Sequence, residues 1–382
     1  MDASELQAWL RLALTPGVGN ITARKLLAAF GSAQAIFEQS SAALHQLGSD
    51  KLAASLRSEP PGLAAQLQIT RDWLQGGGDR RLAVLGDAAY PAALLDIEDP
   101  PLMLYMLGTL VDAGLFATEQ IAHSLAIVGS RNPTPQGEGN ARQFAKAFGS
   151  AGICVVSGLA LGIDGAAHDG ALLGGGQTIA VVGTGLDRVY PKKHLDLAHR
   201  IARQGMIISE FPLGTPPLTA NFPKRNRIIS GLSRGTLVVE AALQSGSLIT
   251  ARLAAEQGKE VFAIPGSIHS PQSRGCHALI RQGAKLVEVA QDVLEEFKPL
   301  PAACAAPQAA PALREGDEPA ESVGAAEDDL LAALGFDASS LDALQARTGL
   351  DTAHLQARLL ALELDGQVVR LPGGLFQRMA SC

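Results

Sequence analysis

The chain has few aromatic residues, no paired cysteine motif and no long apolar run. Aromatic residues make up 4% of its 382 positions. The eight histidines show no zinc-ligand spacing with the cysteines, and no apolar run approaches the roughly 18 residues of a membrane span. The cysteines form no CxxC pair and stand at Cys154, Cys276, Cys304 and Cys382. The chain opens Met1-Asp2-Ala3 without a secretory leader, so we expect a cytoplasmic protein in a reducing compartment, with no metal, cofactor or membrane span.

Positive charge is also scarce. The formal net charge is -7, which excludes a protein that coats nucleic acid by bulk attraction. Any contact with nucleic acid must therefore come from a local basic patch. A hydrophobic content of 47% with 18% charged residues is typical of a globular chain, and the length favours two or three domains.

Residues 1–78 are predicted to form a helical domain. Apolar residues recur at helical spacing over Leu6–Leu14 and Ile21–Phe30, with Thr15-Pro16-Gly17-Val18-Gly19-Asn20 between them. This pattern resembles a helix-hairpin-helix (SAM-like) unit, whose exposed amides can hold a phosphate. The alternative is that the glycines only let two helices pack. Further helices are predicted over Leu44–Leu56 and Leu63–Leu74.

Residues 79–298 alternate short apolar strands with helical segments, which predicts an α/β domain with a parallel sheet. The predicted strands are Leu82–Leu85, Met103–Met106, Leu125–Val128, Ile153–Val156, Thr178–Val182, Met206–Ser209, Thr236–Val239, Val261–Ile264 and Lys285–Val287. Nearly every one ends in Gly, Ser, Glu or Pro, so small and polar loops are expected along one edge of the sheet. In open α/β sheets this edge binds ligands.

The strand at Leu125–Val128 ends in Gly129-Ser130-Arg131 and is followed by a helical segment over Gly137–Phe148. Glycine allows a close approach of ligand or backbone, serine offers a hydroxyl, and arginine presents a fork of donors. The combination suits a phosphate. The neighbouring strand end, Ser157-Gly158, is expected at the same edge.

A second informative stretch is Asn221–Leu232. It places Lys224, Arg225 and Arg227 around Asn226 at the expected start of a helix, beside Phe222. An aromatic ring next to a basic cluster is typical of single-strand binding, because a base stacks on the ring while cations hold the backbone. The alternative is a core phenylalanine beside a solvated basic face.

Read together, several motifs resemble the signature blocks of the DNA-processing protein A family (DprA, also called Smf). They occur in the family's order, without a gap, over roughly residues 80 to 297. The blocks are Val128–Arg131, Ser157–His168, Phe222–Arg227, Val239–Ala241 with Ser245–Thr250, and Ile264–Gly266. The resemblance implies an extended Rossmann-like domain that binds and protects single-stranded DNA and loads the RecA recombinase during natural transformation. It also implies a homodimer formed through the Rossmann-like domain and no catalysis.

The resemblance also implies which residues bind DNA. Those that match the family's blocks or lie near them are Gly129, Ser130, Arg131, Ser157, Gly158, Phe222, Lys224, Arg225, Asn226, Arg227, Ser245 and Gly246. In this resemblance the turn at Gly129–Arg131 holds phosphate and Phe222 packs against a base. Some members carry a lysine three residues before the phenylalanine, where this chain has Thr219, so Lys224 is the candidate substitute.

An enzyme is the second hypothesis. Asp164 and His168 share a helix face and could act as acid and base or hold a metal, but no third ligand is visible at a fitting spacing, so a structural hydrogen-bonded pair is favoured. Glu240 follows a strand, as does an acidic residue in phosphoribohydrolase-like enzymes that process nucleotides. Their PGGxGTxxE pattern is absent here, and the prediction is therefore a protein that is not an enzyme.

The C-terminal part combines a linker and a small domain. Residues 299–325 are rich in Pro and Ala and predict a linker. Residues 326–382 predict helices over Glu327–Leu334, Leu341–Thr348 and Thr352–Leu364 and a hairpin of Val368–Arg370 with Leu375–Arg378, which resembles a winged helix. The segment Asp351–Asp365 carries one arginine against three acidic residues, so we expect this domain to contact protein rather than DNA.

Overall fold

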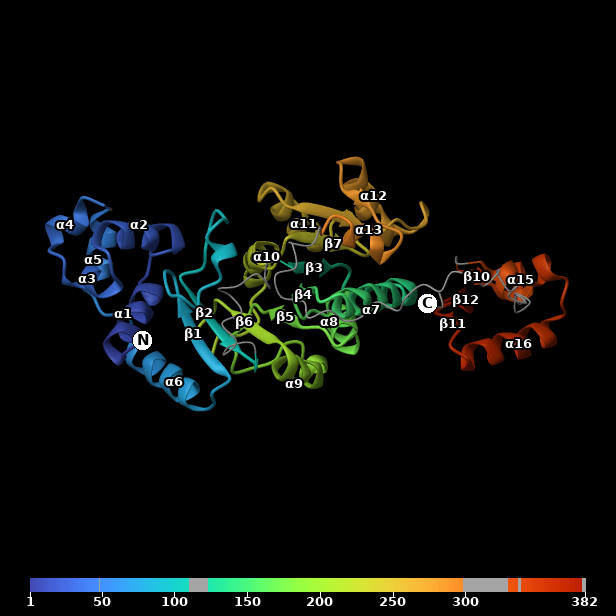
Figure 1. Cartoon of the computed structure of the whole chain (residues 1–382), viewed down its shortest axis with the longest axis horizontal. Helices are drawn as coiled ribbons and strands as arrows, with labels where there is room; N and C mark the ends of the chain where they lie inside the picture. The colour runs from blue at the N-terminus through green and yellow to red at the C-terminus, as the bar shows by residue number, and fades with distance from the viewer. Residues whose placement is uncertain (48, 110–122, 298–328, 336–337, 380–382) are drawn as a thin grey trace, which may run out of the picture. The chain divides into compact units, whose positions relative to one another are not determined.

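The computed structural model describes residues 1–47, 49–109, 123–297, 329–335 and 338–379. The chain divides into two compact units, Met1–Ala290 and Gln291–Cys382 (Figure 1). The linker predicted at residues 299–325 lies outside the described residues. Within the described ranges, no helix is both long and apolar enough to cross a membrane.

The first unit begins with a helical region. Its helices are α1 (Ala3–Leu14), α2 (Asn20–Phe30), α3 (Ala33–Glu38), α4 (Ser41–His45), α5 (Asp50–Arg57) and α6 (Leu63–Gln75). Helix α1 begins where the Asp2 carboxylate accepts hydrogen bonds from the amides of Ser4 and Glu5, both at 2.8 Å. The single helix predicted over residues 44–56 is wrong. Two helices form there because the Ser49 hydroxyl accepts a hydrogen bond from the Leu52 amide at 3.3 Å and so starts α5.

The sequence of the central region forms one nine-stranded sheet. Its strands are β1 (Arg80–Val84), β2 (Met103–Leu107), β3 (Ser124–Val128), β4 (Cys154–Ser157), β5 (Thr178–Val181), β6 (Met206–Ser209), β7 (Gly235–Val238), β8 (Glu260–Ala263) and β9 (Lys285–Leu286). Their order is β1-β2-β6-β5-β4-β3-β7-β8-β9. All nine predicted strands are therefore confirmed, with bounds that differ by at most two residues.

The prediction of a wholly parallel sheet needs one correction. Strands β3 to β9 pair in parallel, whereas β2 pairs antiparallel with both β1 and β6. A parallel connection needs a long crossover, usually a helix. The segment between β1 and β2 contains only a short 3-10 helix, Ala92–Leu94, so the two strands meet as an antiparallel pair.

The helical region packs on this antiparallel edge. Leu10 and Leu26 from the helices share one buried cluster with Leu82 of β1 and Tyr105 of β2. The Trp73 ring of α6 meets the Tyr105 ring edge-on, with centroids 5.8 Å apart. Apolar burial of this kind contributes about 25 cal/mol per Å² and fixes the helical region to the sheet.

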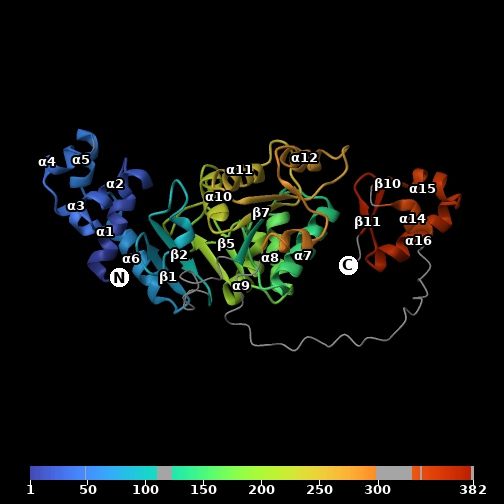
Figure 2. The same ribbon diagram turned by 45° about the horizontal axis from the view of Figure 1, so that its top comes forward.

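Both faces of the parallel part of the sheet are covered by helices (Figure 2). The helices are α7 (Pro135–Ser150), α8 (Ile163–Leu173), α9 (Leu195–Gln204), α10 (Asn221–Gly231), α11 (Ser247–Glu256) and α12 (Arg274–Arg281). Helix α13 (Ala290–Leu294) falls almost wholly in the second unit. Alternate residues of β5 divide between the faces. Ile179 and Val181 join a cluster with α10 and α11, and Ala180 joins one with α8 and α9, as does Val182 just after the strand. The alternation places α10 and α11 side by side on one face.

The second unit has the predicted winged-helix elements. They are α14 (Asp329–Leu334), α15 (Leu341–Thr348), α16 (Thr352–Leu364), β10 (Ser339–Ser340), β11 (Val368–Leu371) and β12 (Leu375–Arg378). The hairpin predicted from Pro372-Gly373-Gly374 forms, and β10 adds a short third strand in the order β10-β12-β11. Leu344, Leu355 and Phe376 belong to its buried core.

Candidate functional site

A pocket of about 650 Å³ lies where the strand order of the sheet reverses. From β3 the chain adds β4, β5 and β6 on one side, and then β7, β8 and β9 on the other. The carboxyl ends of β3 and β7 are therefore followed by loops that diverge, which is the usual place of a ligand crevice in an α/β sheet. The loops after β3, β5 and β7 and the start of α10 line this pocket.

The turn after β3 is held from two sides. A Cβ atom on Gly129 would lie 2.6 Å from Cγ1 of Ile163 and 2.9 Å from the carbonyl oxygen of Glu240, so only glycine fits there. The amide of Ser130 donates to that same Glu240 carbonyl at 2.7 Å, and its carbonyl accepts from the Ile163 amide at 3.1 Å. The buried serine therefore fixes the turn, and the exposed Arg131 follows at the pocket wall.

An arginine and two aromatic rings stand next to each other in the pocket. The Arg131 guanidinium lies 5.4 Å from the centroid of the half-buried Phe222 ring, a cation–π distance. The Tyr190 ring lies 5.9 Å from Phe222 with a 36° angle between the ring planes. Phe222 therefore does not belong to the core, and the alternative of a core phenylalanine is not what the structure shows.

Arg225 lines the pocket but is almost fully buried. The residue is 4% exposed, donates to the Gly158 carbonyl at 3.0 Å and pairs with the Asp164 carboxylate at 3.9 Å. Burial lowers the pKa of this guanidinium, while Asp164 acts in the opposite direction. A Cβ on Gly158 would overlap the guanidinium, so the glycine makes room for the arginine.

Ser157 and Gly158 do not line the pocket. The Ser157 hydroxyl is fully buried and donates to the Ile127 carbonyl at 2.6 Å, which ties β4 to β3. Gly158 contributes its carbonyl to Arg225. Both residues stabilise neighbouring elements outside the pocket lining. A DNA contact from them stays a prediction.

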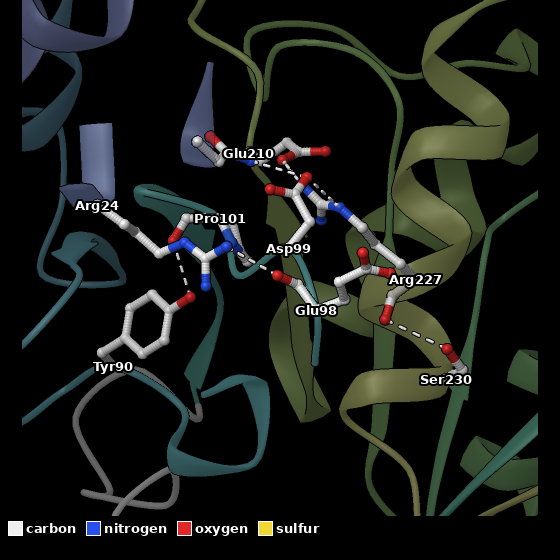
Figure 3. Close-up of polar contacts among 9 residues, drawn as sticks. Arg24, Tyr90, Glu98, Asp99, Pro101, Glu210, Arg227 and Ser230 are labelled. Atoms are coloured by element: carbon white, nitrogen blue, oxygen red, sulfur yellow. Dashed lines mark hydrogen bonds and ion pairs between the residues drawn. The ribbon is translucent and has the colours of Figure 1, made fainter. Parts of the chain in front are cut away.

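Arg227 does not line the pocket, and its guanidinium lies beside Asp99 and Glu210 (Figure 3). Its guanidinium pairs with Asp99 at 3.2 Å and with Glu210 in a short contact, and its side chain is 12% exposed. Burial raises the pKa of the Glu210 carboxyl, while Arg227 acts to lower it. The positive charge of Arg227 is thus paired with two carboxylates of the protein.

The helix-hairpin-helix segment meets this ion-pair cluster. Arg24 of α2 donates to the Glu98 carbonyl at 2.7 Å, and Asn20 donates to Asp99 at 3.2 Å (Figure 3 shows Arg24). Gly17 has a positive φ of 84°, which lets α1 and α2 form their hairpin. Both predicted roles of this hairpin, binding a phosphate or only packing two helices, stay predictions. The Arg24 guanidinium donates to a carbonyl of the protein.

The remaining predicted residues form or flank the open side of the pocket. Asn226 donates to the Gly246 carbonyl at 3.4 Å, which joins α10 to the loop after β7. The hydroxyls of Ser245 and Ser247 lie 2.7 Å apart in that loop. Lys224 is exposed but does not line the pocket, and the exposed Thr219 does.

The candidate catalytic groups have structural partners. Both carboxylate oxygens of Glu240 bind Thr134, whose amide donates at 2.9 Å and whose hydroxyl donates at 2.5 Å. Burial raises the pKa of Glu240, and the Thr134 bonds act to lower it. This contact ties the loop after β7 to the N-terminus of α7, where Thr134 is the capping residue.

The hydrogen-bonded pair predicted for Asp164 and His168 is wrong. Asp164 accepts from the Ala160 amide at 3.3 Å and pairs with Arg225, and His168 Nδ1 lies 2.7 Å from the Thr178 hydroxyl. Nε2 of His168 has no hydrogen-bond partner, and the residue is fully buried. In the described ranges, no group of three His, Cys, Asp or Glu residues could hold a metal ion.

Sequence reasoning missed several pocket residues. Tyr190 comes from the loop after β5, and Gln272 from the 3-10 helix Pro271–Ser273, where it donates to the Asn132 carbonyl at 3.3 Å. The position of Tyr190 in the sequence could have indicated its place in the pocket. The loop after β5 follows a strand end like those of Gly129 and Ser157, and its tyrosine is one of only three in the chain.

Three family models match the chain. The model described as DNA recombination-mediator protein A matches residues 81–298, the DprA winged helix domain matches 306–374, and the DprA-like N-terminal HHH domain matches 3–52. They confirm the predicted fold class of a helical region, a Rossmann-like sheet and a winged helix. The domain boundaries proposed at residues 78, 298 and 325 stay predictions.

Individual relatives agree with the family models. Protein Smf of Escherichia coli (strain K12) is 43% identical over 298 residues, which are 77% of this chain and 76% of that protein. The X-ray structure of DprA from Streptococcus pneumoniae has a TM-score of 0.61 and 36% identity and covers 78% of this chain and 99% of that one. A structure of DNA processing protein A from Helicobacter pylori, solved for its single-stranded DNA binding mode, has a TM-score of 0.50 and 30% identity and covers 57% and 95%.

The matched family consists of recombination mediators and DNA-processing proteins, not of enzymes, in agreement with the prediction of a non-enzymatic protein. The first family model alone spans more than half of the chain, and the Escherichia coli relative exceeds two fifths identity over three quarters of it. The chain belongs to the DNA-processing protein A family, DprA, also called Smf.

Proposed function

We propose that the chain binds single-stranded DNA in the pocket between β3 and β7, protects it and helps to load the RecA recombinase onto it. The observation that carries the proposal is the exposed Arg131 fork 5.4 Å from the Phe222 ring inside this pocket. A cation beside an open aromatic face can hold a phosphate and a base of the same strand. The Helicobacter pylori relative with a described single-strand binding mode supports this reading.

The predicted residues take two roles in this proposal. Arg131, Phe222, Asn226, Ser245 and Gly246 face the strand, and Lys224 meets its backbone outside the pocket. Gly129 and Ser130 line the pocket too and, with Arg131, form the turn that holds a phosphate in this proposal. Arg225 is a buried residue of the pocket lining, and Ser157, Gly158 and Arg227 position the others from outside the pocket.

We further propose a cytoplasmic homodimer that contacts RecA. Unpaired DNA and its recombinase meet in the cytoplasm, and family membership favours both partners. In this proposal the last strand of the sheet order, β9, provides the self-association edge, with the exposed apolar residues Leu286 and Val289 on and beside it. Analytical ultracentrifugation of the full chain tests the dimer, and a monomer at micromolar concentration would contradict it.

Fluorescence anisotropy with a labelled oligothymidine tests the binding proposal. The dissociation constant should rise steeply with salt, with a log–log slope of about 0.7 per neutralised phosphate, and the matching duplex should bind more weakly. Little base preference is expected because stacking and phosphate contacts read no base edges. Equal affinity for both DNA forms, or no salt dependence, would contradict the proposal.

RecA loading has its own readout. RecA assembly on the same single strand, followed by its DNA-dependent ATP hydrolysis, should begin sooner when the full chain is present. The Arg131→Ala variant is the control, because it should bind DNA poorly and shorten the delay less. An unchanged delay with the wild-type chain would contradict the loading role and leave DNA binding in place.

A further inference from the structure

The pocket contains a second ring, Tyr190, that is open to solvent. Tyr190 is 47% exposed, lines the pocket and lies 5.9 Å from the Phe222 ring. A tyrosine that served only to pack Phe222 would bury its own face, whereas half of this side chain is accessible. Two neighbouring open rings offer stacking surfaces for two bases rather than one.

The loop that carries Tyr190 has a fixed shape. The Asp187 carboxylate accepts from the Gly214 amide at 2.7 Å at one end of the loop. At the other end, Nδ1 of His194 lies 3.1 Å from the Leu159 carbonyl. A ring held by such a loop is already positioned before a ligand arrives, which reduces the entropy lost on binding.

Two cations follow Tyr190 after a single proline, Pro191. Lys192 and Lys193 form the 3-10 helix Lys192–His194 and are exposed. Because the chain spans at most about 3.6 Å per residue, the Cα atoms of Lys192 and Lys193 lie within about 7 Å and about 11 Å of that of Tyr190. Arg188, at the start of the same loop, is already paired with Asp187 at 2.7 Å. No ion pair of the two lysines is found among the described residues.

We propose that Tyr190 stacks a second base and that Lys192 and Lys193 hold the phosphate that follows it, so that the strand leaves the pocket over the loop Asp187–His194. The ligand is single-stranded nucleic acid, and the proposal rests on the function proposed above. Positive charge on the opposite wall is lacking, because the loop after β7 presents the neutral side chains of Gln244 and Ser245 there. The strand is therefore directed toward the lysines.

A double-mutant cycle that combines Tyr190 variants with abasic DNA tests whether Tyr190 stacks on a base. Oligothymidines of about four nucleotides, short enough to favour one register, carry an abasic site at each position in turn. In the wild-type chain, loss of the base over Tyr190 should weaken binding about tenfold. In Tyr190→Ala the same loss should have no further effect, and in Tyr190→Phe it should weaken binding as in the wild type. Equal losses in wild type and Tyr190→Ala at every position would overturn the stacking role.

Salt dependence tests the two lysines. The double variant Lys192→Ala/Lys193→Ala should reduce the log–log salt slope by about 0.7 for one lost phosphate contact. The matched control is Lys51→Ala/Lys146→Ala, which removes the same charge from exposed positions outside the pocket and should keep the wild-type slope. Identical slopes in the two double variants would overturn the phosphate role.

These outcomes are separable from failure of the proposed function. If the wild type binds oligothymidine and Arg131→Ala weakens binding, DNA binding by the pocket stands whatever Tyr190 does. If Tyr190→Ala and the lysine variant then match the wild type, the path over the loop is wrong. If the wild type itself does not bind, the proposed function fails together with this inference.

Discussion

The first turn of α10 and the turn that follows it carry similar residues in opposite environments. Phe222 lines the pocket and Lys224 is exposed, whereas Arg225 is buried and Arg227 is mostly buried, each paired with at least one carboxylate. In sequence the three cations form one basic cluster. In the structure only the lysine is exposed to solvent, and the two arginines bind the protein's own oxygen atoms.

This difference in burial distinguishes residues of α10 that can contact a ligand from residues that stabilise the fold. A buried guanidinium loses its hydration and is stable only with a paired carboxylate and hydrogen bonds. Asp164 and the Gly158 carbonyl supply these for Arg225, and Asp99 and Glu210 supply them for Arg227. The exposed first turn can therefore bind a ligand, while the buried residues hold α10 in place.

The largest expected effect is on stability. Arg225→Met leaves Asp164 buried without its cation, so the free energy of unfolding in urea should fall by about 3 kcal/mol. The control Arg200→Met breaks an exposed ion pair with Asp169 and should change it by less than about 1 kcal/mol. Unchanged stability of Arg225→Met with lost DNA affinity would make Arg225 a direct DNA contact.

The next largest effect is expected on the pH dependence of stability, through the buried His168. Burial lowers the pKa of His168 from 6.5 to about 3. Below pH 6.5 the unfolded chain therefore binds a proton that the folded chain does not, so this stability is present above pH 6.5 and is lost as pH falls toward 3. Between pH 6.5 and 5 the wild type should lose about 2 kcal/mol more than His168→Gln.

Chemical denaturation across this pH range measures the difference. The exposed His199→Gln serves as the control and should follow the wild type. If His168→Gln showed the same pH dependence as the wild type, burial would not keep the His168 ring neutral. The contrast between exposed and buried residues would then be weaker.

The salt slope of DNA binding separates the two turns of α10 directly. Lys224→Ala should lower the log–log slope by about 0.7, because one phosphate contact is lost. Arg227→Gln should leave the slope unchanged, since its charge is already paired with Glu210 and Asp99. Anisotropy titrations on folded protein measure both, and the reverse pattern would place Arg227 on the DNA.

The smallest effect is expected from removal of the winged helix. Helix α16 with its flanking cap, residues 351–365, carries Arg358 against Asp351, Glu363 and Asp365. A chain that ends at Lys298 should therefore bind oligothymidine within about twofold of the full chain, because acidic surface repels phosphate. Loss of most of the affinity would show that this domain contacts DNA.

Strand positions could be predicted from the sequence because buried parallel strands are short apolar runs that end in turn residues. The antiparallel edge could not, since the direction of β2 depends on the connection before it and not on its own residues. The split of α4 from α5 depended on a single serine cap, which competes with helical periodicity over the same residues.

The pocket was predicted in outline from its strand ends and from Phe222. Sequence could not show which cations are free, because the partners of Arg227 lie 17 and 128 residues away in the chain. Tyr190 was missed for a similar reason. Its ring meets Phe222 only after β5 and α10 have packed in the fold.

Oligothymidine affinity of the double variant Arg131→Ala/Phe222→Ala is the most direct test of the whole account. With the fold verified by circular dichroism and unfolding, we expect binding to weaken by at least about a hundredfold, because one phosphate contact and one stacked base are lost together. The matched double variant Arg200→Ala/Phe144→Leu, on α9 and α7, should bind like the wild type. Wild-type affinity of the Arg131→Ala/Phe222→Ala chain would mean that the strand binds elsewhere on the molecule.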